Sequence, residues 1–336
     1  MWLYLAGLVV LYHLLRWYRE RQVVSHLQDK YVFITGCDSG FGNLLARQLD
    51  MRGMRVLAAC LTEKGAEQLR NQTSGRLETV ILDVTKTESI SAATQWVKEH
   101  VGDRGLWGLV NNAGIYLSCG YLEWQKMEDC VSIVNVNLIG LIQMTLSMLP
   151  LVRSARGRVV NVSSVLGRLA CFGGFYAVSK YGVEAFSDTL SIEIVISFHQ
   201  RTQLEGFYFR REIGDFGVKV SIITPGAFRT GETNLKLSIE KMKQDWEETP
   251  AHIKAAYGQR LFDTFCSTAK ERLANCSIDL NLVTDCMEHA VTSVHPRTRY
   301  IAGWDAHLFF IPLSYLPTAL ADYILHLYSP RPAHVV

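Results

Sequence analysis

Residues 31–42 read Tyr31-Val-Phe-Ile-Thr35-Gly36-Cys-Asp-Ser-Gly40-Phe-Gly42, and this stretch decides the fold. Its first five residues are all β-branched or aromatic and end at a glycine, which predicts a buried strand. A helix is expected to follow from about Phe41 to Met51. Three glycines between a strand and a helix let the backbone approach a pyrophosphate, and the helix N-terminus points N–H groups at that anion. A glycine cluster alone is more often a turn, but at the start of a βαβ unit it predicts dinucleotide binding.

The rest of the body alternates strands and helices in the same way. Further strands are expected at 55–60, 77–82, 105–110, 158–162 and 218–223, with helices at 63–71, 89–101, 130–149 and around Tyr176. Repeated βα units predict an α/β fold, a single Rossmann-type doubly wound parallel sheet with helices on both faces. Ligands of such a sheet bind at the carboxyl ends of its strands.

Composition sets the outer limits of function. The chain has 336 residues, 49% of them hydrophobic, so it can bury a large core. Its net charge of +2 makes no electrostatic case for nucleic acid. The eight cysteines are scattered without paired or His-linked spacing, which favours reduced thiols over a disulfide framework and indicates no metal site.

Residues 1–27 separate from the body by composition. Trp2 to Leu15 is almost entirely apolar, and Arg16, Arg19 and Arg21 follow. No basic region precedes this run and no small-residue cleavage site follows it, which favours a retained membrane anchor over a signal peptide. The run is short for a full span, so it either lies in the interface or spans with aromatic residues at headgroup level.

A second apolar segment closes the chain at 306–336. Its stretch from Leu308 to Tyr328 is broken by Pro312 and Pro317, which makes it a poor spanning helix. Two interpretations stay open, a hydrophobic flap that touches the membrane and a packed terminal helix.

Polar residues follow the third and fourth strands. Asp83-Val84 ends the third strand, where a carboxylate can accept from an adenine amino group or simply make a turn. Asn111-Asn-Ala-Gly114 ends the fourth strand with small and polar residues beside the expected cofactor path, or forms only a turn. Both positions are candidate cofactor contacts.

Tyr176-Ala-Val-Ser-Lys180 carries the chemistry. A Tyr and a Lys four residues apart on one helix lie on the same face. An ammonium beside a phenol stabilises the phenolate and lowers the phenol pKa toward working pH. The pair therefore predicts a general acid/base for an alcohol or ketone, although many amphipathic helices carry this spacing by chance.

In this order the motifs resemble those of the classical short-chain dehydrogenases/reductases. They are Thr35-Gly-x-x-x-Gly40-x-Gly42, Asn111-Asn-Ala-Gly114, a Ser twelve before Tyr176, the Tyr176/Lys180 pair and Pro225-Gly226. The resemblance covers about residues 29–305. Residues 33–42, 180–187 and 295–305 are similar to the membrane-bound retinol/hydroxysteroid dehydrogenase branch.

The resemblance implies roles for single residues. Tyr176 would be the acid/base, Lys180 would assist it and hold the nicotinamide ribose, and Ser164 would bind the substrate oxygen. Asn137 would hold a water that relays protons to Lys180, and Asn135 is the second candidate for this role. The cofactor-binding residues would be Thr35, Gly36, Ser39, Gly40, Phe41, Gly42, Asp83, Val84, Asn111, Ala113, Gly114, Tyr176, Lys180, Pro225, Gly226 and Thr230.

The sequence indicates the identity of the cofactor and of the substrate less directly. The end of the second strand, Cys60-Leu-Thr-Glu63-Lys64, lacks the Asp that often binds a ribose 2′-OH. The resemblance implies NAD, with NADP open because Lys64 can meet a 2′-phosphate. It also implies an apolar retinoid or steroid substrate under a lid at 227–290, membrane lipid as a partner through the N-terminal segment, and the endoplasmic reticulum membrane as location.

The stretch 191–209 departs from the family pattern. It separates Leu190 from Arg210, where the family helix would run directly toward the strand at Val218. Ser191-Ile-Glu193-Ile can continue the helix while the remainder loops out. The stretch puts homodimerisation in doubt, because the family uses this helix at a subunit interface, and it leaves an alternative in which the chain binds cofactor but is catalytically impaired. The body domain then runs from 28 to 305.

Overall fold

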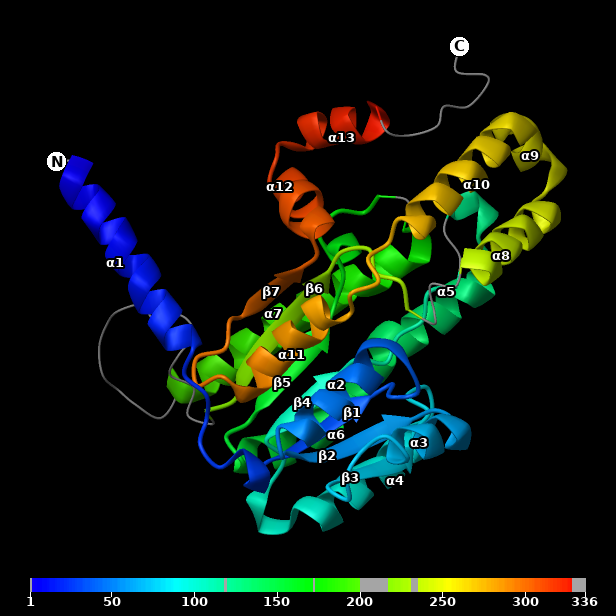
Figure 1. The fold of residues 1–336 in the computed structure, drawn as a ribbon. Coiled ribbons are helices and arrows are strands. Elements are labelled where there is room, and N and C mark those ends of the chain that lie inside the picture. The colour runs from blue at the N-terminus through cyan, green and yellow to red at the C-terminus, as the bar shows by residue number, and fades with distance from the viewer. Residues whose placement is uncertain (1, 118–119, 172, 200–216, 231–234, 328–336) are drawn as a thin grey trace.

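The computed structural model describes residues 2–117, 120–171, 173–199, 217–230 and 235–327. Seven parallel strands form one sheet in the order β3-β2-β1-β4-β5-β6-β7 (Figure 1). They are β1 Tyr31–Thr35, β2 Arg55–Cys60, β3 Leu77–Ile81, β4 Gly108–Asn111, β5 Arg158–Val162, β6 Lys219–Pro225 and β7 Arg299–Ala302. The strand order reverses between β1 and β4, which is the switch point where such sheets bind ligands.

Helices cover both faces of the sheet, as the sequence predicts. α2 (Gly40–Met51), α3 (Glu63–Arg70) and α11 (Asn281–Thr292) pack on one face, and α4 (Thr87–Val101), α6 (Leu141–Ser154) and α7 (Gly174–His199) on the other. Residues of β1 are buried throughout because a parallel sheet is covered on both sides. Short 3₁₀ turns lie at Leu27–Asp29, Gly102–Arg104, Leu122–Trp124 and Val165–Gly167.

The long apolar helix expected at 130–149 begins earlier and changes its winding. It consists of α5 (Met127–Val134), a π turn at Asn135–Gly140 and α6. Among the described residues this is the one helix with the length and hydropathy of a membrane span. Met144, Met148 and Val152 on its inner face are fully buried under the sheet, which identifies it as a core helix.

The lid is smaller than the sequence suggests. α8 (Leu235–Glu248), α9 (Ala251–Tyr257) and α10 (Gln259–Ala274) stand beyond the end of the sheet, in yellow in Figure 1. Trp124, Trp246 and Phe262 lie at the centre of their separate aromatic core. α11 belongs instead to the sheet core, because Val283 and Met287 pack there, so the lid ends near residue 274 rather than 290.

Both terminal segments are helical. α1 (Trp2–Glu20) extends away from the body with exposed apolar side chains (Figure 1). A π turn (Ala306–Phe310), α12 (Ile311–Ser314) and α13 (Thr318–Leu327) follow β7. Leu313 and Ala321 pack inward against Leu169, whereas Tyr315 and Tyr323 are exposed. The inward packing agrees with the interpretation of a packed terminal helix, and contact with a membrane stays a prediction.

Two further differences concern β7 and the stretch 191–209. The sequence patterns did not predict β7, whose four residues are too few to show a period. α7 continues past Leu190 to His199, as the helical continuation at Ser191 requires. The rest of the stretch, from residue 200, lies outside the described residues.

Candidate active site

The glycine loop between β1 and α2 folds tightly against the loop after β4. Gly36 has φ +71°, and a Cβ on it would lie 2.8 Å from the Cα of Ala113. A Cβ on Gly42 would lie 2.3 Å from the carbonyl oxygen of Gly36. Since no side chain fits at either position, the backbone stays bare and a ligand can approach it closely.

Thr35 and Asn112 fix these two loops to each other. The Thr35 hydroxyl accepts hydrogen bonds from the backbone N–H groups of Asn112 and Ala113, each at 3.0 Å. The Asn112 side chain donates to the carbonyl oxygens of Thr35 and Gly36 at 2.9 and 3.1 Å. Thr35 thus positions the loop, and Asn112, which sequence reasoning passed over, lines the cavity.

Asn111 points elsewhere. Its amide nitrogen donates to the Thr145 hydroxyl and to Asn161 Oδ1, both at 2.8 Å, inside the core. Because successive strand residues face opposite sides of a sheet, only one of the two asparagines can reach the cavity. Asn112, rather than the predicted Asn111, therefore lines the cavity.

Asp83 and Val84 also lie apart from the residues that line the cavity. The Asp83 carboxylate accepts from the Thr85 hydroxyl at 2.6 Å and the Thr85 N–H at 3.0 Å, and pairs with Lys86 at 3.1 Å. The hydrogen bonds from Thr85 are the main reason that the pKa of Asp83 is lowered. This is the turn geometry that the sequence left open. Val84 packs beneath Gly140.

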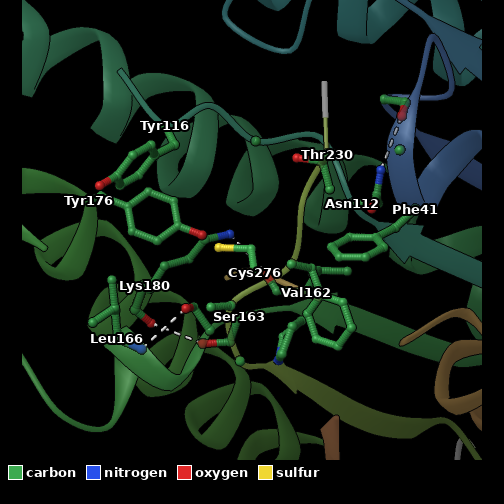
Figure 2. Close-up of a pocket in the computed structure, with 18 of the residues that line it drawn as sticks. Phe41, Asn112, Tyr116, Val162, Ser163, Leu166, Tyr176, Lys180, Thr230 and Cys276 are labelled. Atoms are coloured by element: carbon green, nitrogen blue, oxygen red, sulfur yellow. Dashed lines mark hydrogen bonds between the residues drawn. The ribbon is translucent and has the colours of Figure 1, made fainter. Parts of the chain in front are cut away.

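Tyr176 and Lys180 share one face of α7 and enter the same cavity, as Figure 2 shows. Lys180 is buried, and its Nζ donates to the Val162 carbonyl oxygen at 2.9 Å. This bond holds the ammonium 5.5 Å from the centre of the Tyr176 ring. The Tyr116 ring stands edge-on against Tyr176 with centroids 5.2 Å apart. The predicted pair is therefore assembled and held from two sides.

Ser163 and Ser164, at the end of β5, both border the cavity. Ser164 Oγ accepts from the Leu166 N–H at 3.2 Å, so its own hydroxyl hydrogen remains available to donate. Ser163 Oγ is within 3.5 Å of the Lys180 carbonyl oxygen, inside the protein. Ser164 is the better placed of the two to bind a substrate oxygen.

Asn137 sits fully buried in the π turn. Its Oδ1 accepts from the Ile115 N–H at 2.7 Å, and its Nδ2 donates to the Ile115 carbonyl oxygen at 3.0 Å and to Ser179 Oγ at 3.1 Å. A Cβ on Gly114 would lie 3.4 Å from Asn137 Oδ1 and 3.7 Å from Lys180 Nζ. The π turn thus brings an amide to the strand loop and to α7 at once, which π segments often do at functional sites.

The cavity has about 1080 Å³ of empty space, part of it open to solvent. Its far wall is the loop after β6, with Pro225, Gly226 and Thr230 as predicted. Asp305 holds this loop by accepting from the Ala227 N–H at 2.7 Å. Phe228 closes one side by packing edge-on against Phe41 at 5.8 Å.

A second, mostly apolar compartment opens from the first. The two share seven lining residues, among them Tyr116, Ser164 and Leu273, and the second has about 850 Å³ of empty space, part of it open to solvent. Its wall includes one face of α10, with Phe265, Ala269 and Leu273 at helical spacing. A mostly apolar wall with a few polar groups is typical of sites that bind apolar small molecules.

An acidic side chain does stand at the end of β2, but it comes from the glycine loop. Asp38 accepts from the Leu61 N–H at 2.7 Å, the Thr62 N–H at 3.0 Å and the Thr62 hydroxyl at 2.7 Å. Thr62 in turn caps α3 by accepting from the Gly65 N–H. The sequence of β2 does not reveal this carboxylate, because Asp38 belongs to the glycine loop and reaches the strand end only in the fold.

These features together fit a dinucleotide. The bare glycine backbone and the N-terminus of α2 suit a pyrophosphate, and Lys180 and Asn112 border the adjoining space. The predicted cofactor residues Gly36, Ser39, Gly40, Phe41, Gly114, Tyr176, Lys180, Pro225, Gly226 and Thr230 all line this one cavity.

Comparison with known proteins agrees with this geometry. Residues 30–196 match the family model described as short chain dehydrogenase. The chain is 70% identical to human 17-beta-hydroxysteroid dehydrogenase type 6 and 60% identical to rat retinol dehydrogenase 7, in each case over the full length of both chains. A solved short chain dehydrogenase/reductase from Burkholderia phymatum, in complex with NAD, has the same fold, with a TM-score of 0.64, 20% identity and coverage of 91% of this chain and 98% of that one.

The chain therefore belongs to the short chain dehydrogenase family and is an oxidoreductase that uses a nicotinamide cofactor. The catalytically impaired alternative gains no support. α7 holds Tyr176 and Lys180 in the cavity and continues unbroken through Leu190.

Proposed function

We propose that this member of the family interconverts the alcohol and the carbonyl of an apolar hydroxysteroid or retinoid, with NAD as cofactor, at the endoplasmic reticulum membrane. The observation that carries the proposal is the meeting of Ser164, Tyr176 and Lys180 where the glycine-loop cavity joins the apolar compartment. The names of the two relatives, a hydroxysteroid dehydrogenase and a retinol dehydrogenase, support the substrate class.

Each of the three side chains has one task. The bound nicotinamide supplies the hydride acceptor or donor. Ser164 donates its hydroxyl hydrogen to the substrate oxygen and holds it near the phenol. Tyr176 takes the alcohol proton during oxidation and returns it during reduction. The edge-on contact with Tyr116 holds the Tyr176 ring in position for this transfer. The Lys180 ammonium, anchored on the Val162 carbonyl, stabilises the phenolate by its charge.

Asn137 acts as a positioning residue in this proposal. Its three hydrogen bonds tie Ile115, in the loop after β4, to Ser179, one residue before Lys180. The water relay that the family resemblance implies would start beside this amide. A loss of kcat in an Asn137→Ala variant, with unchanged binding of NADH, would support that role.

The choice of NAD follows from Asp38. Its carboxylate occupies the N-terminus of α3, where a ribose 2′-phosphate would otherwise find N–H donors. A phosphate placed there would meet a like charge, which costs several kcal/mol. Glu63 lies nearby but pairs with Arg70 at 2.8 Å.

An exchange of Asp38 tests this choice. Asp38→Asn keeps an acceptor for Thr62 and removes the charge, so we expect the ratio of kcat/KM for NADP over NAD to rise by at least about tenfold. Lys64→Ala is the matched variant on the same helix. A fall in NADP use in Lys64→Ala, with no gain in Asp38→Asn, would favour NADP binding through Lys64 instead.

Membrane association rests on α1. Its apolar side chains Leu8, Leu11 and Leu15 are more than half exposed, which soluble surfaces rarely allow in one contiguous patch. Trp17 follows them with the Arg21 guanidinium 3.9 Å from its ring centre, a pairing suited to the headgroup region. An apolar alcohol concentrates in the bilayer, so an anchored enzyme meets it there.

The full-length protein in microsomes provides the test of the function. With NAD and either a 3α-hydroxysteroid or all-trans-retinol, we expect NADH to form. A variant lacking residues 1–20 should lose turnover of membrane-dissolved substrate while keeping turnover of detergent-dissolved substrate. Cofactor binding without NADH formation for any apolar alcohol would contradict the proposal.

A further inference from the structure

Two walls of the catalytic cavity come from distant parts of the chain. One is the glycine loop, where Gly40 and Phe41 line the cavity. The other is the loop after β6, where Pro225, Phe228 and Thr230 line it. Both walls border the space that fits a dinucleotide, so a bound cofactor lies against both. The contact between the walls therefore bears on how the cofactor enters and leaves.

Hydrogen bonds hold the glycine loop from behind. Thr35 and Asn112 fix it to the loop after β4. Asp38 fixes it to the end of β2 through the backbone N–H groups of Leu61 and Thr62. Because these bonds run to two neighbouring strands, this wall has a defined place at the edge of the sheet.

The loop after β6 is held from behind in the same way. Asp305 accepts from the Ala227 N–H at 2.7 Å. The Ser277 carbonyl oxygen accepts from the Arg229 N–H at 2.8 Å, and the Ser277 N–H donates to the Ala227 carbonyl oxygen at 3.0 Å. The Gly226 N–H donates to the carbonyl oxygen at the end of β7 at 2.8 Å. This wall is therefore fixed to β7 and to the chain just beyond α10.

The two walls meet at a pair of aromatic rings. The Phe41 ring (Figure 2) stands edge-on against the Phe228 ring, with centroids 5.8 Å apart and planes at 79°. Beside them, a Cβ on Gly40 would lie 3.6 Å from the Cβ of Thr230. One edge-on ring contact is weak beside the several hydrogen bonds behind each wall. The walls should therefore part at the rings before either leaves its support.

The two rings differ in how firmly they are packed. Phe228 is 5% exposed and belongs to the sheet core, whereas Phe41 is only partly buried against that core. Phe41 is thus the less firmly held half of the contact, and it can be changed with less damage to the fold.

A dehydrogenase must exchange its nicotinamide cofactor in every catalytic cycle, and such release steps often set kcat. We propose that the contact between Phe41 and Phe228 is a gate that opens whenever the cofactor enters or leaves. The inference requires only that the protein uses a nicotinamide cofactor, so it does not depend on the substrate proposed above.

A gate has a kinetic signature that a simple binding contact lacks. It closes on the free protein and on the bound cofactor alike, so weakening it lowers the barrier in both directions. Association and dissociation then quicken by the same factor, and the dissociation constant stays the same. A side chain that binds the cofactor directly has another signature, because its loss speeds dissociation alone and weakens affinity.

Phe41→Leu tests this signature, because it removes the ring contact and keeps an apolar side chain. Full-length protein in detergent is mixed with NADH in a stopped-flow instrument, and both rates are followed by energy transfer from tryptophan to NADH. We expect each rate to rise by about two- to tenfold, the factor that corresponds to an edge-on ring contact. The dissociation constant should not change.

Three further variants identify the contact itself. Phe228→Leu should raise both rates as Phe41→Leu does. The double variant should add little to either single one, because the contact is already lost. Phe309→Leu is the matched control, since Phe309 stands edge-on against Phe310 at 5.2 Å and does not line the catalytic cavity. It should leave both rates unchanged.

Two results with Phe41→Leu would overturn the inference. A faster dissociation without a faster association would show that the ring binds the cofactor or shapes the loop. Unchanged rates would show that the cofactor passes without parting the rings. A wild type that binds no NADH would contradict the choice of NAD, and the same measurements with NADPH would then decide the gate.

Discussion

The cofactor side and the lid of this molecule are held together by different forces. Around the glycine loop, buried polar groups are held by directional hydrogen bonds, as Thr35 is by Asn112 and Ala113, and Asn137 by Ile115 and Ser179. In the lid, aromatic rings pack by shape, and Trp246 stacks on Phe262 with centroids 4.7 Å apart and planes 8° apart.

The lid contacts the body through the Trp124 ring, which packs against Trp246 and Phe265, and through polar contacts near the surface. Lys241 of α8 pairs with Asp129 of α5 at 2.7 Å, and Tyr257 donates to Glu123 at 2.6 Å. Directional hydrogen bonds fix one geometry, whereas apolar packing tolerates volume-conserving exchange. The difference indicates that the residues around the glycine loop tolerate few substitutions, whereas the apolar residues of the lid tolerate exchange for others of similar volume.

The largest effect is expected at the chemical centre itself. Tyr176→Phe removes the hydroxyl but keeps the ring that packs against Tyr116. Loss of the proton donor and acceptor should lower kcat by about 10²- to 10⁴-fold, with unchanged binding of NADH. Steady-state kinetics and fluorescence titration of NADH measure the two quantities. Loss of NADH binding in this variant would show that the tyrosine acts structurally.

The next effect concerns the glycine loop. Gly36→Ala places a methyl group 2.8 Å from the Ala113 Cα at a backbone φ of +71°, so the loop must shift. We expect NADH affinity to fall by at least about tenfold, since backbone strain of this kind costs about 1–3 kcal/mol. Gly53→Ala has a positive φ as well but nothing within 4 Å of its Cβ, and it lies outside the cavity. Equal loss of NADH affinity in both variants would contradict the role of the loop.

A variant in the lid should weaken substrate binding and leave NADH binding unchanged. Trp246→Ala removes a buried ring from the aromatic core, and such truncations cost about 3–5 kcal/mol when the site cannot collapse. Because this core is separate from the sheet core, we expect KM for the steroid to rise while the dissociation constant of NADH stays the same. A parallel loss of NADH binding would show that lid and cofactor side form a single cooperative unit.

The smallest effect is expected where α1 joins the body. Glu20 is bound by Arg297 and by Arg16, and the hydrogen bond from Arg297 is the main reason that its pKa falls to about 2. The folded pKa lies below the ordinary value of 4.5, so this contact stabilises the fold above about pH 4.5 and weakens as the pH falls toward 2.

Glu20→Gln removes that dependence on pH. The Arg297 side chain is 44% exposed, so the contact should contribute less than about 1 kcal/mol. The difference in unfolding free energy between wild type and variant should shrink between about pH 5 and about pH 3. A difference that stayed constant over this range would assign the stabilisation to groups other than the Glu20 carboxylate.

The cofactor side could largely be predicted from the sequence. β1, β2 and β5 have the predicted bounds because parallel strands buried on both faces appear as continuous apolar runs. Tyr176 and Lys180 could be paired because helical spacing alone places them on one face. The π turn at Asn135–Gly140 could not be predicted, since one extra residue in a turn leaves no mark on an apolar helix.

The remaining residues depend on tertiary contacts between distant parts of the chain. Asp38 reaches the end of a strand to which it does not belong. Asn112 rather than Asn111 faces the cavity, because the register of β4 decides the direction of both side chains. Phe265 and Ala269 line the apolar compartment only through the placement of α10.

Deuterium transfer tests the central claim most directly. A 3α-hydroxysteroid labelled with deuterium on its carbinol carbon is incubated with NAD and full-length protein in microsomes, and the reduced cofactor is analysed by mass spectrometry. We predict rapid labelling of NADH with the wild type and labelling about 10²- to 10⁴-fold slower with Tyr176→Phe. An unlabelled cofactor with the wild type, or equal transfer by the variant, would contradict an alcohol dehydrogenase centred on Tyr176.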